Sequence, residues 1–173
     1  MKKILIVVDM QKDFVDGSLG TAEAQKIVAP AAEYIRGFEG EIIATLDTHT
    51  EDYLTTPEGK KLPVLHCIKG TDGWELAPEI AAALSEKGYD RVTKETFGST
   101  ALPAYIQEKY RHFDKIELFG LCTDICVISN AIILKNSFPD IPITVHSSLS
   151  AGVTPEKHEA ALEVMRSCQI DVI

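Results

Sequence analysis

The stretch ILIVVD, residues 4–9, decides the fold class. Its five consecutive apolar residues, mostly β-branched, are typical of a parallel strand that is covered on both faces. Asp9 ends the apolar run. Further short runs with strand character follow at 41–47, 91–94, 115–120 and 143–147, and DVI at 171–173 is expected to form a last edge strand.

Segments with apolar residues at helical spacing separate these runs. They are predicted to form helices at 21–37, 77–87, 123–138 and 154–168, with Pro30 as a kink in the first of them. Alternating strands and helices predict an open α/β sheet of about six strands, mainly parallel, with helices on both faces. Because no linker, repeat or low-complexity segment interrupts this pattern, we assign residues 1–173 to a single domain.

Composition excludes several classes of function. Apolar residues make up 45% of the 173-residue chain, and the formal net charge is −9. A negative chain repels phosphate backbones and anionic lipids, so nucleic-acid and membrane partners are not expected. No apolar run is long enough to span a bilayer, and no signal-peptide cleavage site follows the first strand, which favours a cytoplasmic protein. We expect the four cysteines to be reduced thiols.

A long segment without regular structure is predicted at residues 48–75. Loops of this length are usually functional, and this one follows the carboxyl end of a strand, where open α/β sheets bind their ligands. Asp47 and His49 stand at its start, Glu58 in its middle and His66 near its end. Carboxylate and imidazole ligands suit Zn²⁺, Fe²⁺ or Mn²⁺. The spacing alone leaves a metal site and ordinary loop hydrogen bonds as equal alternatives.

The segment GLCTDICV, residues 120–127, carries two cysteines four positions apart after an expected strand. We expect Thr123 or Asp124 to cap the following helix, which places Cys126 in its first turn, where the helix dipole favours a thiolate. Lys94 at another strand end would lower the pKa of a nearby thiol, and Asp9 could accept its proton. Spacing alone nevertheless favours two small buried hydrophobic residues over a nucleophile.

The chain as a whole resembles the isochorismatase-like cysteine hydrolases, and within them the nicotinamidases. The segments that carry the resemblance are VVDMQKDF at 7–14, LDTH at 46–49, HCIKGTDG at 66–73, KETFGST at 94–100, GLCTDICV at 120–127 and HEAALEVM at 158–165. The order and spacing of these segments cover nearly the whole chain.

The resemblance implies a catalytic triad of Asp9, Lys94 and Cys126, with Cys126 as the nucleophile. It also implies a cis peptide bond before Cys122 and an oxyanion hole formed by the backbone N–H groups of Cys122 and Cys126. The implied metal ligands are Asp47, His49, Glu58 and His66, for zinc by default, with iron or manganese as alternatives. The implied substrate-binding residues are Phe14, Phe97 and Leu121.

Three positions depart from the pattern of the family. Cys122 stands where relatives usually carry alanine or another small residue, Pro63 where many nicotinamidases carry an aromatic residue, and Ser148 where relatives often carry an aspartate. The Pro63 departure bears on the substrate, because that position belongs to the expected pocket wall.

The function that the resemblance implies is the hydrolysis of nicotinamide to nicotinate and ammonia through a cysteine thioester. The alternatives are another amidase of the superfamily, a metal-free hydrolase of a vinyl ether, and a binding protein without activity. The expected partner is a small-molecule amide. Homo-oligomerisation is left open by the sequence.

Overall fold

A computed structural model describes all 173 residues. Its centre is one six-stranded sheet with strand order β3-β2-β1-β4-β5-β6, and every neighbouring pair is parallel. The strands are β1 (Lys3–Val8), β2 (Glu41–Asp47), β3 (Asp90–Lys94), β4 (Lys115–Gly120), β5 (Ile143–Val145) and β6 (Asp171–Val172). The predicted open, parallel α/β sheet is therefore confirmed.

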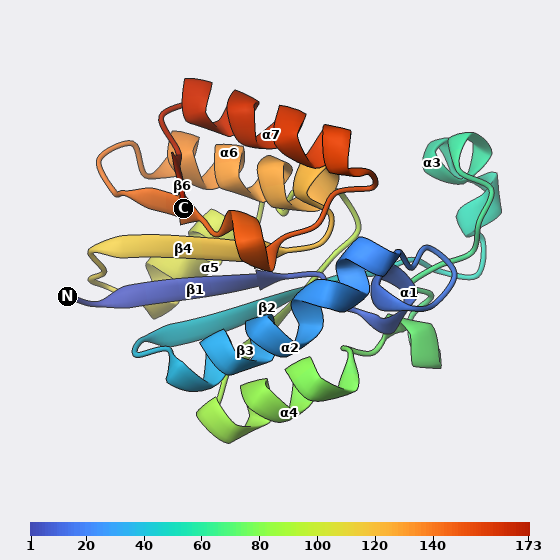
Figure 1. Cartoon of the computed structure of the whole chain (residues 1–173), viewed down its shortest axis with the longest axis horizontal. Coiled ribbons are helices and arrows are strands. Elements are labelled where there is room, and N and C mark those ends of the chain that lie inside the picture. Colours follow the sequence, from blue (N-terminus) through green and yellow to red (C-terminus); the bar gives the residue numbers. More distant parts are fainter.

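Seven α-helices connect the strands, and the longer ones cover the faces of the sheet (Figure 1). They are α1 (Lys12–Val15), α2 (Ala22–Gly37), α3 (Pro57–Lys61), α4 (Pro78–Lys87), α5 (Leu102–Lys109), α6 (Ile128–Ser137) and α7 (Pro155–Ser167). Helices α2 and α4 contribute to one buried cluster, and α5, α6 and α7 contribute to another. No helix is both long enough and apolar enough to cross a membrane.

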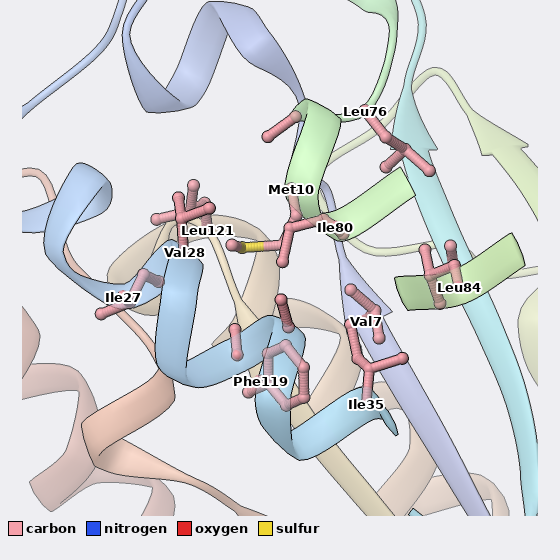
Figure 2. Packing of buried hydrophobic residues seen from close by; sticks show 14 of the residues in the cluster. Val7, Met10, Ile27, Val28, Ile35, Leu76, Ile80, Leu84, Phe119 and Leu121 are labelled. Atoms are coloured by element: carbon pink, nitrogen blue, oxygen red, sulfur yellow. The ribbon is translucent and has the colours of Figure 1, made fainter. Parts of the chain in front are cut away.

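The β1 strand explains why the apolar run at residues 4–8 is continuous. Leu5 and Val7 point into the cluster with α2 and α4, whereas Ile4, Ile6 and Val8 point into the other cluster. Figure 2 shows the first cluster, in which Val7 and Phe119 of the sheet lie among side chains of α2 and α4. Because each face of the central strand packs against helices, both sets of alternating side chains have to be apolar.

Several predicted elements differ from the structure in their bounds. The predicted helix 123–138 begins with a wide π-type turn at Thr123–Val127, and α6 follows from Ile128. Cys122, rather than Thr123 or Asp124, occupies the cap position, because the Asp124 side chain accepts from the Val153 N–H instead (2.9 Å). The strand predicted at 143–147 ends at Val145. The α2 helix runs from Ala22 to Gly37 through Pro30, as predicted apart from Thr21, which is its cap.

Three helices occupy segments for which none was predicted. The segment 48–75 contains α3 and two short 3₁₀ turns, α1 forms at Lys12–Val15, and α5 forms at Leu102–Lys109. All three helices are short, and α3 has only one buried residue, so the sequence gives little apolar periodicity to detect. In Figure 1, α3 stands away from the sheet beyond the carboxyl ends of the strands.

A buried carboxylate in the middle of β4 is held by charged and polar neighbours. Glu117 is 3% exposed, and it accepts hydrogen bonds from Tyr34 Oη (2.5 Å) and His146 Nε2 (2.7 Å). Lys115 Nζ lies 3.3 Å from its other oxygen. Burial acts to raise the pKa of Glu117, but the bonds from Tyr34 and His146 and the charge of Lys115 outweigh it and lower the pKa to about 2.

This pKa shift predicts how stability depends on pH. Because the folded-state pKa of Glu117 lies below the ordinary value of 4.5, its stabilisation is complete above that value and is lost as the pH falls toward about 2. Glu117→Gln should lower the free energy of unfolding at pH 7 by about 2 to 3 kcal/mol. In urea titrations, the difference between parent and variant should narrow as the pH falls from 5 to 3.

The matched control is Glu159→Gln, which alters an exposed glutamate on α7. It should change the free energy of unfolding by less than about 0.5 kcal/mol at any pH. A Glu117→Gln effect of the same size at pH 7 and pH 3 would contradict the assignment of a lowered pKa.

Candidate active site

The carboxyl ends of β1 and β3 bring Asp9 and Lys94 together. Asp9 follows β1 with a φ of 47°, and its N–H donates to the Thr45 carbonyl (3.1 Å). Lys94 is the last residue of β3, in register with Asp47 of β2. Its Nζ lies 2.6 Å from Asp9 Oδ2 and 3.3 Å from Asp47 Oδ1, and all three side chains are buried.

Cys126 approaches this pair from the turn that follows β4. The backbone turns at Gly120, where φ is 136° and a Cβ would lie 2.1 Å from the Val8 carbonyl oxygen, so only glycine fits. The Leu121–Cys122 peptide bond is cis, as the resemblance implied. Cys126 then lies in the π-type turn, 4% exposed, with Sγ 3.5 Å from Lys94 Nζ.

Asn130 fixes the turn that carries Cys126. Its side-chain amide donates to the Cys126 carbonyl (2.8 Å), and its side-chain oxygen accepts from the Ser99 N–H (2.9 Å). Asn130 is fully buried. It therefore ties the loop after β3 to the turn after β4, and so keeps Lys94 and Cys126 on facing sides of one site.

The three groups shift one another's ionisation. Burial raises the pKa of Asp9, against the opposing charge of Lys94. Burial and the Asp9 charge raise the pKa of the Cys126 thiol well above its ordinary value, and Lys94 only partly offsets them. Burial acts to lower the pKa of Lys94, but Asp9 and Cys126 raise it further than burial lowers it. Lys94 therefore stays charged, and a Cys126 thiolate forms most readily when its proton moves to Asp9.

A second cluster lies beside this group and contains three of the four predicted metal ligands. Ligand atoms of Asp47, His49 and His66 all lie within 4.8 Å of one another, and the three residues are buried. His49 Nε2 is 3.1 Å and His66 Nε2 is 3.8 Å from Asp47 Oδ2. Glu58, the fourth predicted ligand, has Oε1 3.8 Å from His49 Nε2.

The donor set fits a divalent transition metal. His66 Nδ1 lies 2.8 Å from the Val64 carbonyl oxygen, which can only accept, so Nδ1 carries the proton and Nε2 keeps its lone pair for a ligand bond. Burial acts to raise the pKa of Asp47, but the hydrogen bond from His49 and the Lys94 charge lower it, so Asp47 is a carboxylate. Two imidazoles and one or two carboxylates match the preferences of zinc, iron and manganese.

A cavity of about 230 Å³ connects the two clusters. It is lined mainly by apolar side chains, together with Cys126 and the carboxylate and imidazole groups, as follows: Phe14, Leu19, Thr21, Asp47, Glu58, Leu62, His66, Phe97, Cys122, Ile125, Cys126 and Val153. A larger hollow of about 580 Å³ lies at the opposite end of the sheet, around Lys3 and Tyr110, and contains no such clusters. The smaller cavity is the candidate active site, because it reaches both a buried thiol and residues of a metal-ligand set.

The predicted substrate-binding residues have different outcomes. Phe14 and Phe97 both line the cavity, Phe14 with its ring tilted against that of His66 and Phe97 with 48% of its surface exposed. Leu121 does not line it. The Leu121 side chain is 1% exposed and packs in the core with Val28 and Met10 (Figure 2), because pairing with Ala151 continues the sheet by one residue and directs this side chain inward.

Gln11 is a supporting residue that the sequence analysis missed. It is fully buried, and its side-chain amide donates to the carbonyls of Asp47 (2.8 Å) and Trp74 (2.9 Å) while its oxygen accepts from the Asp47 N–H (2.8 Å). The left-handed backbone at Asp9 takes the chain away from β2, and Gln11 replaces the missing strand neighbour of Asp47. A polar residue three positions after a buried strand was the available signal.

Comparison with known proteins points to one family. The family model described as isochorismatase domain matches residues 3–173. The nicotinamidase/pyrazinamidase of Mycobacterium tuberculosis is 28% identical over 195 residues, which span 99% of this chain and 98% of that protein.

Solved structures agree with the sequence comparison. The pyrazinamidase/nicotinamidase of Streptococcus mutans superposes with a TM-score of 0.84 at 30% identity, covering 99% of this chain and 100% of that chain. The pyrazinamidase of Pyrococcus horikoshii in complex with zinc superposes with a TM-score of 0.81 at 27% identity, covering 100% of this chain and 99% of that chain.

The contacts of Gln11 predict that replacing its side-chain amide with a carboxylate greatly lowers the free energy of unfolding. Gln11→Glu replaces a donor with an acceptor opposite two carbonyl oxygens, so the free energy of unfolding should fall by about 3 kcal/mol or more at pH 7. Gln25→Glu makes the same change on the exposed side of α2 and should cost less than about 0.5 kcal/mol. Equal losses for the two variants in urea titrations would show that Gln11 does not hold Asp47.

Proposed function

The chain belongs to the isochorismatase family, and we propose that it is a nicotinamidase, an amide hydrolase that converts nicotinamide to nicotinate and ammonia. The observation that carries the proposal is that Cys126 faces the same apolar cavity as Asp47 and His66, which form a metal-ligand cluster with His49. A thiol positioned for acyl transfer suits the amide, and a metal-ligand set suits a ring nitrogen. The cavity, at about 230 Å³, is large enough for a single heteroaromatic ring.

The first half of the proposed reaction forms a thioester. Asp9 accepts the proton of Cys126, and the charge of Lys94 stabilises the thiolate at 3.5 Å. The sulfur attacks the carboxamide carbon, and backbone N–H groups of Cys122 and Cys126 would stabilise the oxyanion. Asp9 then donates the proton that it took from Cys126 to the nitrogen of the carboxamide group. The C–N bond breaks and ammonia leaves.

The second half hydrolyses the thioester. Asp9, again a carboxylate, removes a proton from a water molecule, which attacks the acyl carbon. The carbon–sulfur bond breaks and nicotinic acid leaves, which loses its carboxyl proton to solvent to become nicotinate. The proton held by Asp9 returns to Cys126. Lys94 stays charged throughout, because its contacts with Asp9 and Asp47 favour the ammonium form.

The metal-ligand set supports the choice of a heteroaromatic amide. Asp47, His49 and His66 would hold a divalent ion, zinc by default, with Glu58 as a further ligand. When bound, the ion would supply an electrophilic position for the pyridine nitrogen. Phe14 and Phe97 line the cavity and would contact the two faces of the ring.

The first test of the proposed function concerns the two cysteines of the cavity. Only Cys126 lies within contact distance of Lys94, so Cys126→Ala should lower kcat for ammonia release by about 10³-fold or more. Cys122→Ala should retain kcat within about three-fold, because the proposed role of Cys122 is carried by its backbone. Cys168→Ala alters an exposed thiol and serves as the control. A folded but inactive Cys122→Ala protein would refute the assignment of the nucleophile.

The second test of the proposed function concerns the metal. Chelator treatment should remove activity and Zn²⁺, Fe²⁺ or Mn²⁺ should restore it. His66→Ala should lose bound metal in elemental analysis, whereas His112→Ala, which alters an exposed histidine, should keep it.

Benzamide, which has the amide but lacks the ring nitrogen, should show a kcat/KM about 10²-fold below that of nicotinamide. Equal turnover of the two amides would remove the support for a nicotinamidase.

A further inference from the structure

Thr45 makes two hydrogen bonds to Asp9 and has no assigned part in the reaction. It lies in β2 with no exposed surface, and its backbone carbonyl accepts from the Asp9 N–H (3.1 Å). Its hydroxyl Oγ1 lies 2.6 Å from Asp9 Oδ1. An ionised carboxylate can only accept, so the hydroxyl of Thr45 is the donor when Asp9 is charged.

The two oxygens of the Asp9 carboxylate are therefore not equivalent. Oδ1 faces Thr45, and Oδ2 lies 2.6 Å from Lys94 Nζ, the group that also contacts Cys126 Sγ at 3.5 Å. The other titratable groups that act on Asp9 or sense its charge are Asp47 on β2 and the thiols of Cys67 and Cys122. None of them is a hydrogen-bond donor to Oδ1.

We propose that Thr45 is a positioning residue for the catalytic proton transfer: its hydroxyl occupies Oδ1 of Asp9 and leaves Oδ2 as the oxygen that exchanges a proton with Cys126. This inference rests on the proposed role of Asp9 and Cys126 as the reacting pair. Asp9 is fully buried, and burial favours the neutral acid. The charge of Lys94 at 2.6 Å and the bond from Thr45 oppose this effect and favour the carboxylate.

The chain contains a matched control for this hydroxyl. Thr144 lies in β5 of the same sheet and is 1% exposed, but its hydroxyl has no hydrogen-bond partner. Thr45→Val and Thr144→Val make the same change of a hydroxyl to a methyl group at two buried strand positions. Only the first change removes a bond to a titrating group.

The test is the rate at which iodoacetamide alkylates Cys126, measured by peptide mass spectrometry as a function of pH. In Thr45→Val the carboxylate loses a charge-assisted bond, so the acid-side pKa of the Asp9–Cys126 pair should rise by about one pH unit. Thr45→Ser should restore the parent profile, and Thr144→Val should leave it unchanged. The kcat/KM for ammonia release should show the same acid-side shift, since it reports the free enzyme.

Thr45→Ala, which only removes atoms, carries the same expected shift and remains available if the valine variant fails to fold. A Thr45→Val or Thr45→Ala profile that coincides with the parent would overturn the proposal, and so would an equal shift in Thr144→Val. Because alkylation needs no substrate, a shifted alkylation profile together with no ammonia release from nicotinamide by the parent would support Thr45 and reject the proposed function alone.

Discussion

A buried ion pair between Asp9 and Lys94 is the constraint on which the site depends. Its two charged atoms lie 2.6 Å apart, with at most 1% of either side chain exposed. Removing either partner would leave an uncompensated charge in the interior, which is strongly unfavourable. The pair is possible because parallel strands β1 and β3 flank β2 and end at the same edge of the sheet, where Asp47 and Thr45 of β2 add a second anion and a hydroxyl donor.

The same pair bears on how a buried thiol could serve as the proposed nucleophile. Burial and the negative charge of Asp9 disfavour a free Cys126 thiolate, so the thiol pKa by itself is unfavourable for catalysis. Lys94 contacts both Cys126 and Asp9, and movement of the proton from sulfur to carboxylate keeps the net charge of the group constant. The proposed reaction therefore needs no charge separation beyond the site, and Asp9 can act in turn as base and acid.

Local sequence patterns predict much of the fold, and the residues at the expected ends of strands predict much of the site. The bounds of β2 and β4 agree with the predicted runs, because most residues of a strand covered on both faces are apolar and mark its length. The meeting of Asp47, His49 and His66 was expected from a long loop that returns to a strand end. The roles of Gln11 and Thr45 depend on the register in which Val8 faces Thr45, and spacing along the chain does not specify that register. Leu121 was expected to bind substrate, but one extra bridge to Ala151 turns its side chain into the core.

The central claim is that nicotinamide acylates Cys126, and acid-quenched peptide mass spectrometry of the metal-loaded protein tests it most directly. The protein is mixed with excess nicotinamide, quenched within the first turnovers and digested. The account predicts one nicotinoyl group on the peptide that contains Cys126, labile to hydroxylamine as a thioester is, with ammonia released in step. A nicotinoyl group on any other residue, or ammonia released in a burst while the Cys126 peptide stays unmodified, would contradict it.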